Sequence, residues 1–385
     1  MNTPNTQASK PLAGIVVLEF GHSVAAPFAG QILGDLGARI IKVEKPEGDD
    51  ARKWGPPFVD GAAAAFQAIN RGKQSVVCKL RDAHDIAQLK TLIQDHVDVV
   101  IQNLRPGLMD ELGLGSATLL ASKPSLIYCN MGAFGRTGPM ASRPGYDPLM
   151  QAFGGIMSVV GKEGQESVRV GPAIIDMGTG MWASIGILCS VLKRQATGLG
   201  GVVDVSLYET AVAWMQMHAA QFMASNELPR KVGSGQVGIV PYRAYKTADG
   251  EVVVSAGNNK LFLGFCKAMG QEAWATDARF IDNPVRVQNA DVLYALIEQE
   301  MLKHTNDEWV EILDRFAVPC APVQNTQQML QSAQTQALGM VQNVPGSSIP
   351  LVSLPVSFDG QRPQSPCAAP SLGAHNDAIF QTESV

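Results

Sequence analysis

The stretch VGPAIIDMGTGMWASIGILCSVLKRQATGLGGVVDVSL, residues 170–207, decides how the rest of the chain is interpreted. Its apolar segment Met181–Leu192 has no charged residue, which is typical of a helix that is buried in a core. Asp176 precedes this segment and is expected at the amino end of the helix. After the turn TGLGG, the alternating residues VVDVSL predict a strand. The stretch therefore predicts a core helix that has one acid at its amino-terminal end and is followed by a strand.

Two interpretations of Asp176 compete. Aspartate is among the best N-cap residues, so the carboxylate could simply accept a hydrogen bond from a backbone N–H at the helix end. In the second interpretation, the helix-end N–H groups and the helix dipole hold the carboxylate ionised, and it acts as a nucleophile. Gly178 and Gly180 would then leave room for a substrate carbonyl. Position alone favours capping.

Composition limits the classes of function. The chain has 385 residues, 46% of them hydrophobic and 17% charged, which is enough for a sizeable core and two domains. A net charge of −5 argues against nucleic-acid and anionic-membrane binding. The six cysteines and six histidines are scattered, so no metal site is expected. The segment MNTPNTQASK has no apolar core, and no apolar run approaches the ~18 residues of a membrane span. We expect a cytoplasmic protein.

Strand-like and helix-like segments alternate along the first part of the chain. The strand-like segments are Gly14–Glu19, Arg39–Val43, Gln74–Leu80, Val97–Ile101 and Ser125–Asn130. Helical spacing occurs at Phe28–Leu36 and Ile86–Ile93. This alternation predicts an α/β fold with a Rossmann-like parallel sheet. The first turn, GHSVAAP, lacks the G-x-G-x-x-G pattern of dinucleotide-binding proteins.

The stretch at 170–207 resembles the signature of the class III CoA-transferases, the CaiB/BaiF-type and formyl-CoA transferase-like family. The shared features are Asp, small residues, Thr-Gly, an apolar helix, Lys-Arg, Thr-Gly-x-Gly and Val-Asp-x-Ser-Leu. LGARIIKVEKP at 36–46 and PSLGAHND at 370–377 are also similar to the family, so the resemblance covers nearly the whole chain. In that family the Asp that matches Asp176 is the acyl acceptor, which favours the catalytic interpretation.

The resemblance implies coenzyme A as co-substrate and no metal. Its phosphates need charge-assisted donors, which an acidic protein must supply as a local cluster. NRGK at 70–73 and NLRPG at 103–107 follow strand-like segments, where α/β sheets bind ligands. The residues expected around the CoA nucleotide are Arg39, Lys42, Arg71, Lys73, Asn103 and Arg105. Each cation taken alone could equally be a solvated surface charge.

The segment MGAFGRTGPMASRPGYDPLMQAFGG at 131–155 resembles the part of the family that lines the acyl and pantetheine region. Tyr146 and Gly178 are therefore expected in the acyl pocket. Related acyl-CoA racemases carry His where this chain has Tyr146. A racemase moves an α-proton between two acid/base groups, and a tyrosine hydroxyl replaces an imidazole poorly. A transferase is therefore preferred, although Tyr146 could equally be a packed aromatic residue.

The domain organisation is expected to be a large CoA-binding domain at 1–224, a smaller α+β domain at 225–330 and a C-terminal segment at 331–385 that returns to the large domain. The small domain should contain a hairpin with Asp249-Gly250 as its turn and helices at Phe262–Met269 and Val292–His304. FAVPCAPV at 316–323 resembles the return linker. The resemblance implies long linkers and an intertwined homodimer of interlocked rings.

Family members that transfer CoA from formyl-CoA have a four-glycine loop where this chain has Ala256-Gly257-Asn258-Asn259. Only Gly257 matches, so the loop departs from the family pattern at three of its four positions. Gly257 and Asn258 are still expected at the acyl pocket.

The leading hypothesis is CoA transfer from an acyl-CoA, such as succinyl-CoA, to a free carboxylic acid. It proceeds through an aspartyl acyl-anhydride and an aspartyl-CoA thioester at Asp176. A dicarboxylate acceptor would fit Arg136 or Arg169. One alternative is a 2-methylacyl-CoA racemase or epimerase on the same fold. The other is a non-catalytic acyl-CoA-binding protein, which the departure from the glycine loop favours and the retained Asp176 disfavours.

Overall fold

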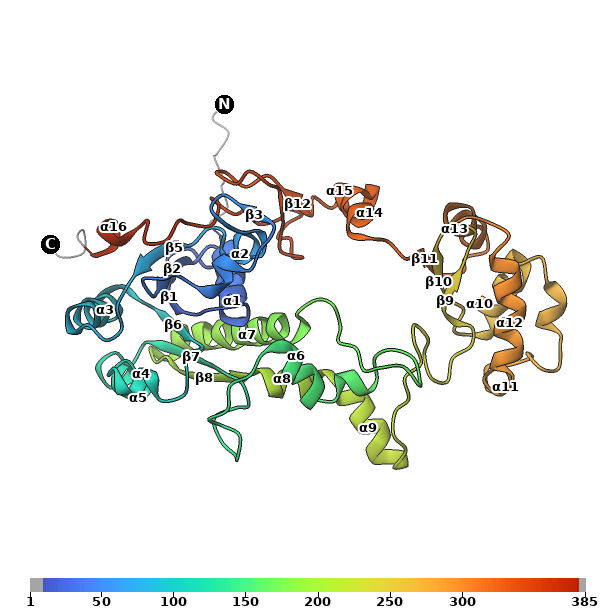
Figure 1. Cartoon of the computed structure of the whole chain (residues 1–385), viewed down its shortest axis with the longest axis horizontal. Coiled ribbons are helices and arrows are strands. Elements are labelled where there is room, and N and C mark those ends of the chain that lie inside the picture. The colour runs from blue at the N-terminus through green and yellow to red at the C-terminus, as the bar shows by residue number, and fades with distance from the viewer. Residues whose placement is uncertain (1–9, 381–385) are drawn as a thin grey trace. The chain divides into compact units, whose positions relative to one another are not determined.

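The computed structural model describes residues 10–380, and the chain divides into two compact units (Figure 1). The first unit contains the described residues up to Ile156, then Arg169–Met223 and the chain from Ala333 onward. The second contains Met157–Val168 and Ala224–Ser332. The short segment Met157–Val168 was not separated from its neighbours by the sequence patterns.

A six-stranded sheet with the order β5-β2-β1-β6-β7-β8 forms the centre of the first unit. All its neighbouring strands are parallel, which confirms the predicted Rossmann-like α/β fold. The order is that of a doubly wound sheet, whose topological switch point lies between β1 and β6. The strands are β1 (Val16–Phe20), β2 (Arg39–Glu44), β5 (Gln74–Val77), β6 (Val99–Gln102), β7 (Ile127–Gly132) and β8 (Gly201–Ser206).

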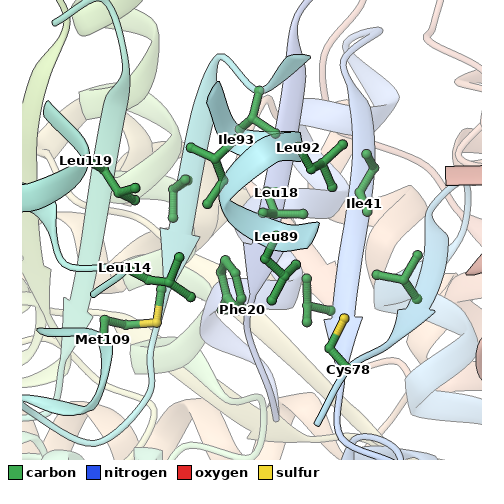
Figure 2. Packing of buried hydrophobic residues seen from close by; sticks show 14 of the residues in the cluster. Leu18, Phe20, Ile41, Cys78, Leu89, Leu92, Ile93, Met109, Leu114 and Leu119 are labelled. Atoms are coloured by element: carbon green, nitrogen blue, oxygen red, sulfur yellow. The ribbon is translucent and has the colours of Figure 1, made fainter. Parts of the chain in front are cut away.

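Helices follow most of these strands, as the alternating sequence pattern predicted. They are α1 (Ala25–Asp35), α2 (Ala64–Asn70), α3 (Ala83–His96), α4 (Leu108–Glu111), α5 (Ser116–Ser122), α6 (Asp147–Phe153), α7 (Ile174–Thr197), α8 (Leu207–Trp214) and α9 (Gln216–Ser225). On one face of the sheet, α3 buries Leu89, Leu92 and Ile93 against strand residues such as Leu18 and Ile41 (Figure 2). This apolar cluster stabilises the sheet, and the loops that line the cavity follow the strands of this sheet.

Helix α7 is longer than the segment Met181–Leu192 from which it was predicted. It ends at Thr197, and the capping residue Gly198 has a φ of 73°, the left-handed conformation that glycine adopts readily at helix ends. By length and composition alone α7 could cross a membrane, since an 18-residue window has a mean hydropathy of 1.5, and this corrects the expectation that no such segment exists. Because α7 packs against α1, α8, β7 and β8, we interpret it as a core helix.

The second unit has a three-stranded antiparallel sheet in the order β11-β10-β9. The predicted hairpin at Asp249-Gly250 is confirmed, because β9 and β10 pair on either side of it. The segment 316–323 is not only a linker: it contributes β11, which pairs with β10. The elements are β9 (Tyr242–Lys246), β10 (Glu251–Ser255), β11 (Cys320–Pro322), α10 (Asn259–Ala268), α11 (Asn283–Gln288), α12 (Ala290–Met301), α13 (Asn306–Arg315) and α14 (Thr326–Gln331).

The chain from Ala333 onward belongs to the first unit and runs back to β5. The amide of His375 donates to the Ser75 carbonyl, and the Asn376 side chain accepts from the Val77 amide. The remaining elements are short: β3 (Phe58–Val59), β4 (Ala62–Ala63), β12 (Val341–Gln342), β13 (Leu351–Val352), α15 (Ala333–Ala337), α16 (Asn376–Phe380) and the 3₁₀ turns Asp50–Lys53, Ile156–Ser158 and Glu272–Ala275.

The close packing of α1 on α7 depends on Gly180. A Cβ atom at this position would lie 2.8 Å from the Ala25 carbonyl oxygen and 3.2 Å from the Ala29 amide nitrogen. We therefore expect Gly180→Val to lower the free energy of unfolding by about 2 kcal/mol, because backbone atoms cannot move away cheaply. Urea denaturation measures the change. Gln195→Val, at an exposed position of the same helix, is the control and should have little effect; equal stability of the two variants would contradict this packing.

Candidate active site

The amino end of α7 is capped by a residue from another helix. Ala173 occupies the N-cap position and its side chain makes no capping bond. Instead, Oδ2 of Asp147 accepts hydrogen bonds from the amides of Ile175 at 2.7 Å and Asp176 at 3.2 Å. Asp147 is buried, and the side-chain Nε2 of Gln151 donates to its other oxygen. The capping interpretation of Asp176 is therefore wrong, because Asp147 performs that task.

The carboxylate of Asp176 is left without a hydrogen-bond donor among the described residues. Burial first, and then the negative charge of Asp147, raise the pKa of Asp176 to about 7. The expectation that the helix end holds this carboxylate ionised is thus contradicted, because Asp147 accepts the available N–H groups. What results is a carboxyl group that is ionised and protonated in similar proportions near neutral pH.

Asp176 lines a cavity of about 680 Å³ at the carboxyl ends of β1, β6 and β7. The cavity lies at the switch point of the sheet, where doubly wound folds bind ligands. Its walls come from the loops after three strands and from the segments that lead into α6 and α7. The lining residues are His22–Ala25, Trp54, Asn103–Pro106, Met131–Ala133, Ser142–Pro148, Arg169, Ala173, Asp176 and Leu207.

Four of the predicted site residues come together here: Asp176, Tyr146, Asn103 and Arg105. Tyr146 is 57% exposed, so it is not a packed core residue. Asn103 uses its side chain to bind the backbone of His22, accepting from its amide and donating to its carbonyl. The guanidinium of Arg105 binds the carboxylate of Glu111 in an exposed pair.

The other predicted phosphate ligands do not line the cavity. Lys42 and Lys73 are fully buried, and both ammonium groups bind Glu19. Arg71 forms a buried ion pair with Asp35. Arg39 donates from Nε to Gln74. A phosphate could bind Lys42, Arg71 or Lys73 only if these ion pairs opened. In the structure the three residues therefore bind carboxylates of the protein, where the sequence predicted that they bind CoA phosphates.

Gly178 faces α8 and not the cavity, which corrects its expected place in the acyl pocket. A Cβ atom at Gly178 would lie 2.8 Å from Cζ2 of Trp214 and 3.0 Å from Cγ2 of Thr210. The glycine therefore permits α7 and α8 to pack closely. Gly257 and Asn258 belong to the second unit, where Asn258 caps α10 by accepting from the Leu261 amide at 2.9 Å. Their contribution to the acyl pocket stays a prediction.

Sequence reasoning missed several residues of the cavity, among them His22, Trp54 and Arg143, and missed the capping role of Asp147. The following Pro148 indicates where α6 begins, since proline is common in the first turn of a helix, but it gives no signal of the cap on α7. Of the two arginines considered for a second carboxylate, Arg169 lines the cavity. Arg136 does not; it pairs with Asp204 at 3.1 Å.

A family model described as CoA-transferase family III matches residues 12–376. The chain belongs to this family. It is 33% identical over 376 residues to "Succinyl-CoA:glutarate CoA-transferase" of Mus musculus, covering 97% of this chain and 86% of that protein. It is 34% identical over 380 residues to "Succinate--glutarate CoA-transferase" of Agrobacterium fabrum, covering 96% and 95%.

A solved structure of a CAIB/BAIF family protein from Brucella suis matches with a TM-score of 0.90 and 35% identity, covering 98% of this chain and 100% of that one. The resemblance to the class III enzymes is therefore confirmed. As a family III CoA-transferase, the protein acts on CoA thioesters and transfers CoA. This sets aside the racemase and the non-catalytic binding protein as leading alternatives.

The raised pKa of Asp176 predicts how this family III CoA-transferase depends on pH. If the ionised carboxylate attacks the thioester, kcat/KM for acyl-CoA should fall as pH decreases through about 7, and be constant above it. Asp147→Asn keeps an oxygen that can accept the α7 amides but removes the negative charge. The pKa of Asp176 should then decrease, so the fall in rate should move to lower pH. A profile unchanged from the wild type would contradict this electrostatic role, and Asp204→Asn, outside the cavity, is the control.

Proposed function

We propose that the protein transfers CoA from succinyl-CoA to a dicarboxylic acid, with Asp176 as the nucleophile. The observation that carries this proposal is the Asp176 carboxylate itself, which lines the cavity, has no donor among the described residues and has a pKa of about 7. A carboxylate with a raised pKa is more basic and attacks a thioester more readily than an ordinary one. The dicarboxylic substrates follow from the names of the two relatives.

The reaction balances in four steps at Asp176. The carboxylate attacks the donor thioester, forming a mixed anhydride and releasing CoA thiolate. The thiolate then attacks the aspartyl carbonyl, which gives an aspartyl-CoA thioester and frees succinate. The acceptor carboxylate attacks this thioester, forming a second anhydride and releasing thiolate again. Finally the thiolate attacks the acceptor's acyl carbon, and the product acyl-CoA leaves with the Asp176 carboxylate restored.

Two adjoining cavities offer room for the coenzyme. A cavity of about 240 Å³ at the ends of β1 and β2 shares His22 and Leu104 with the main cavity. Lys45 also lines this smaller cavity and pairs with Asp50 in an exposed salt bridge. We place the thioester in the main cavity and the nucleotide across the boundary with the smaller one, where Lys45 of the smaller cavity and Arg105 of the main cavity would bind phosphate oxygens. Exposed ion pairs are weak, so a phosphate can displace their carboxylates.

Arg143 and Arg169 are suited to the second carboxylate of the acid. Both line the main cavity, and no carboxylate among the described residues pairs with either of them. The guanidinium of Arg169 also donates to the carbonyls of Val170 and Gly171, which orients it at the segment before α7. A guanidinium binds a carboxylate through two parallel hydrogen bonds, so these residues would favour acids with a carboxylate at the far end.

A homodimer is part of the proposal. Apolar side chains at Met177, Met181 and Ile185, spaced four residues apart along α7, are exposed, and α9 buries none of its residues. A face of this kind is usually covered by a partner, and a second copy of the chain is the partner that the family resemblance implies. We further place the reaction in the cytoplasm, because CoA thioesters are intracellular compounds.

The nucleophile can be identified by isotope transfer. With succinyl-CoA and an ¹⁸O-labelled dicarboxylic acceptor, the label should enter the Asp176 carboxyl, because the bridging anhydride oxygen stays with Asp176 when thiolate attacks the acceptor carbon. After a further turnover it should appear in released succinate. Peptide mass spectrometry locates it. Asp176→Ala should reduce transfer by about a thousandfold or more while acyl-CoA still binds. Label that never enters Asp176, or normal turnover of the variant, would contradict the proposal.

The role of the two arginines is tested by comparing acids. In Arg143→Met and Arg169→Met, the KM for a dicarboxylic acceptor such as glutarate should increase by about tenfold, the effect of losing one charge-assisted pair. The KM for a monocarboxylic acid of similar length should stay unchanged. Arg136→Met, outside the cavity, is the matched control. Equal losses for both kinds of acid would contradict a role of the arginines in binding the second carboxylate.

A further inference from the structure

Three charged side chains, two from strands and one from the residue before a third strand, meet close to the segment that lines one wall of the main cavity. Glu19 lies on β1, Lys42 on β2, and Lys73 directly before β5. The ammonium of Lys42 binds Oε1 of Glu19 at 3.1 Å, and that of Lys73 binds Oε2 at 2.8 Å. All three side chains are fully buried. The sequence predicted that the two lysines bind phosphate, and the structure instead joins them through one carboxylate.

Each ammonium group also binds one end of the segment Gly21–Pro27, which contains the loop after β1 and the first residues of α1. Lys42 donates to the Gly21 carbonyl at 2.5 Å, and Lys73 donates to the Pro27 carbonyl at 2.8 Å. Lys42 also forms an ion pair with Asp49 at 2.9 Å, and Lys73 also donates to Oδ1 of Asn70 at 3.0 Å. Each ammonium group thus has three polar partners within the protein.

The loop is held between these ends as well. Asn103 binds the amide and the carbonyl of His22, at 3.0 and 2.9 Å. Oδ1 of Asp49 accepts from the Ser23 amide at 3.1 Å. Ser23 has a φ of 68°, a conformation that an L-residue rarely adopts unless its surroundings impose it. The segment Gly21–Pro27 is thus held at its first three residues and at its last by side chains from outside it.

Stability alone does not account for so many buried charges. Removing ions from water is costly, and apolar residues of similar volume often stabilise a fold as well or better. The neighbouring chain also makes room for the carboxylate: a Cβ atom at Gly30 would lie 2.0 Å from Oε2 of Glu19. The charged side chains bind the carbonyls of Gly21 and Pro27 and so fix their positions, which apolar side chains could not do.

We propose that Glu19, Lys42 and Lys73 are positioning residues for acyl-CoA binding. They hold the segment Gly21–Pro27, of which His22–Ala25 form one wall of the cavity that contains Asp176. None of the three touches the ligand. Their effect is on the shape of the wall before the ligand arrives, so it concerns binding of any acyl-CoA and does not depend on which acid accepts the coenzyme.

The test uses Lys73→Met and Glu19→Gln in the full-length protein. Both the KM for acyl-CoA and the Kd for CoA from calorimetry should increase about tenfold, while kcat at saturation stays within about threefold, because a displaced wall weakens binding more than chemistry. Asp98→Asn is the matched control. Asp98 accepts from the Val16 amide at the opposite end of β1 and pairs with Arg194, so its loss should reduce stability and leave both binding constants unchanged.

A Lys73→Met protein that is less stable but binds CoA with the wild-type Kd would overturn the proposal. If the variants do not fold, amide hydrogen exchange in the wild-type protein tests whether the segment is held. The Ser23 amide should exchange about a hundredfold more slowly than that of exposed Gly164, because a held loop opens rarely. Equal exchange rates at the two positions would show that the loop is not held, and would also overturn the proposal.

Discussion

The hydrogen bonds that Asp147 accepts from the first amides of α7 are the constraint on which the site depends. A helix end needs acceptors for its unpaired N–H groups, and the side chain of the N-cap residue is the usual source. Here a buried acid from α6 supplies them, so Asp176 keeps its carboxylate for other partners. Two neighbouring carboxylates thereby acquire different tasks from their environments: one completes the structure and the other remains reactive.

The topology of the sheet explains why the parts of the site meet. Parallel strands end at one edge, and the helices that follow them begin there, so the loops after β1, β6 and β7 and the start of α7 share one cavity. Gly180 allows α7 to approach α1 closely, which brings the first turn of α7 near the loop after β1. The buried charges around Glu19 then fix that loop.

The sequence predicted the parallel sheet well, because strands buried on both faces are near-continuous apolar runs that differ clearly from helical spacing. It also pointed to Asp176, through the resemblance of the residues around it. It did not predict the burial of Lys42, since lysine in a strand is normally exposed and its carboxylate partner lies 23 positions away in the chain. The capping bond from Asp147 was missed for a similar reason: it joins residues 28 and 29 positions apart.

The central claim is that Asp176 is a desolvated carboxyl group beside a second carboxylate, with no hydrogen-bond donor among residues 10–380. Its ionisation can be followed directly by ¹³C NMR of the carboxyl carbon in protein labelled at aspartate, with Asp176→Asn identifying the resonance. The account predicts a titration midpoint at about pH 7. A midpoint near 3.8, the ordinary value for aspartate, would contradict it, because it would mean that water or protein donors already stabilise the charge.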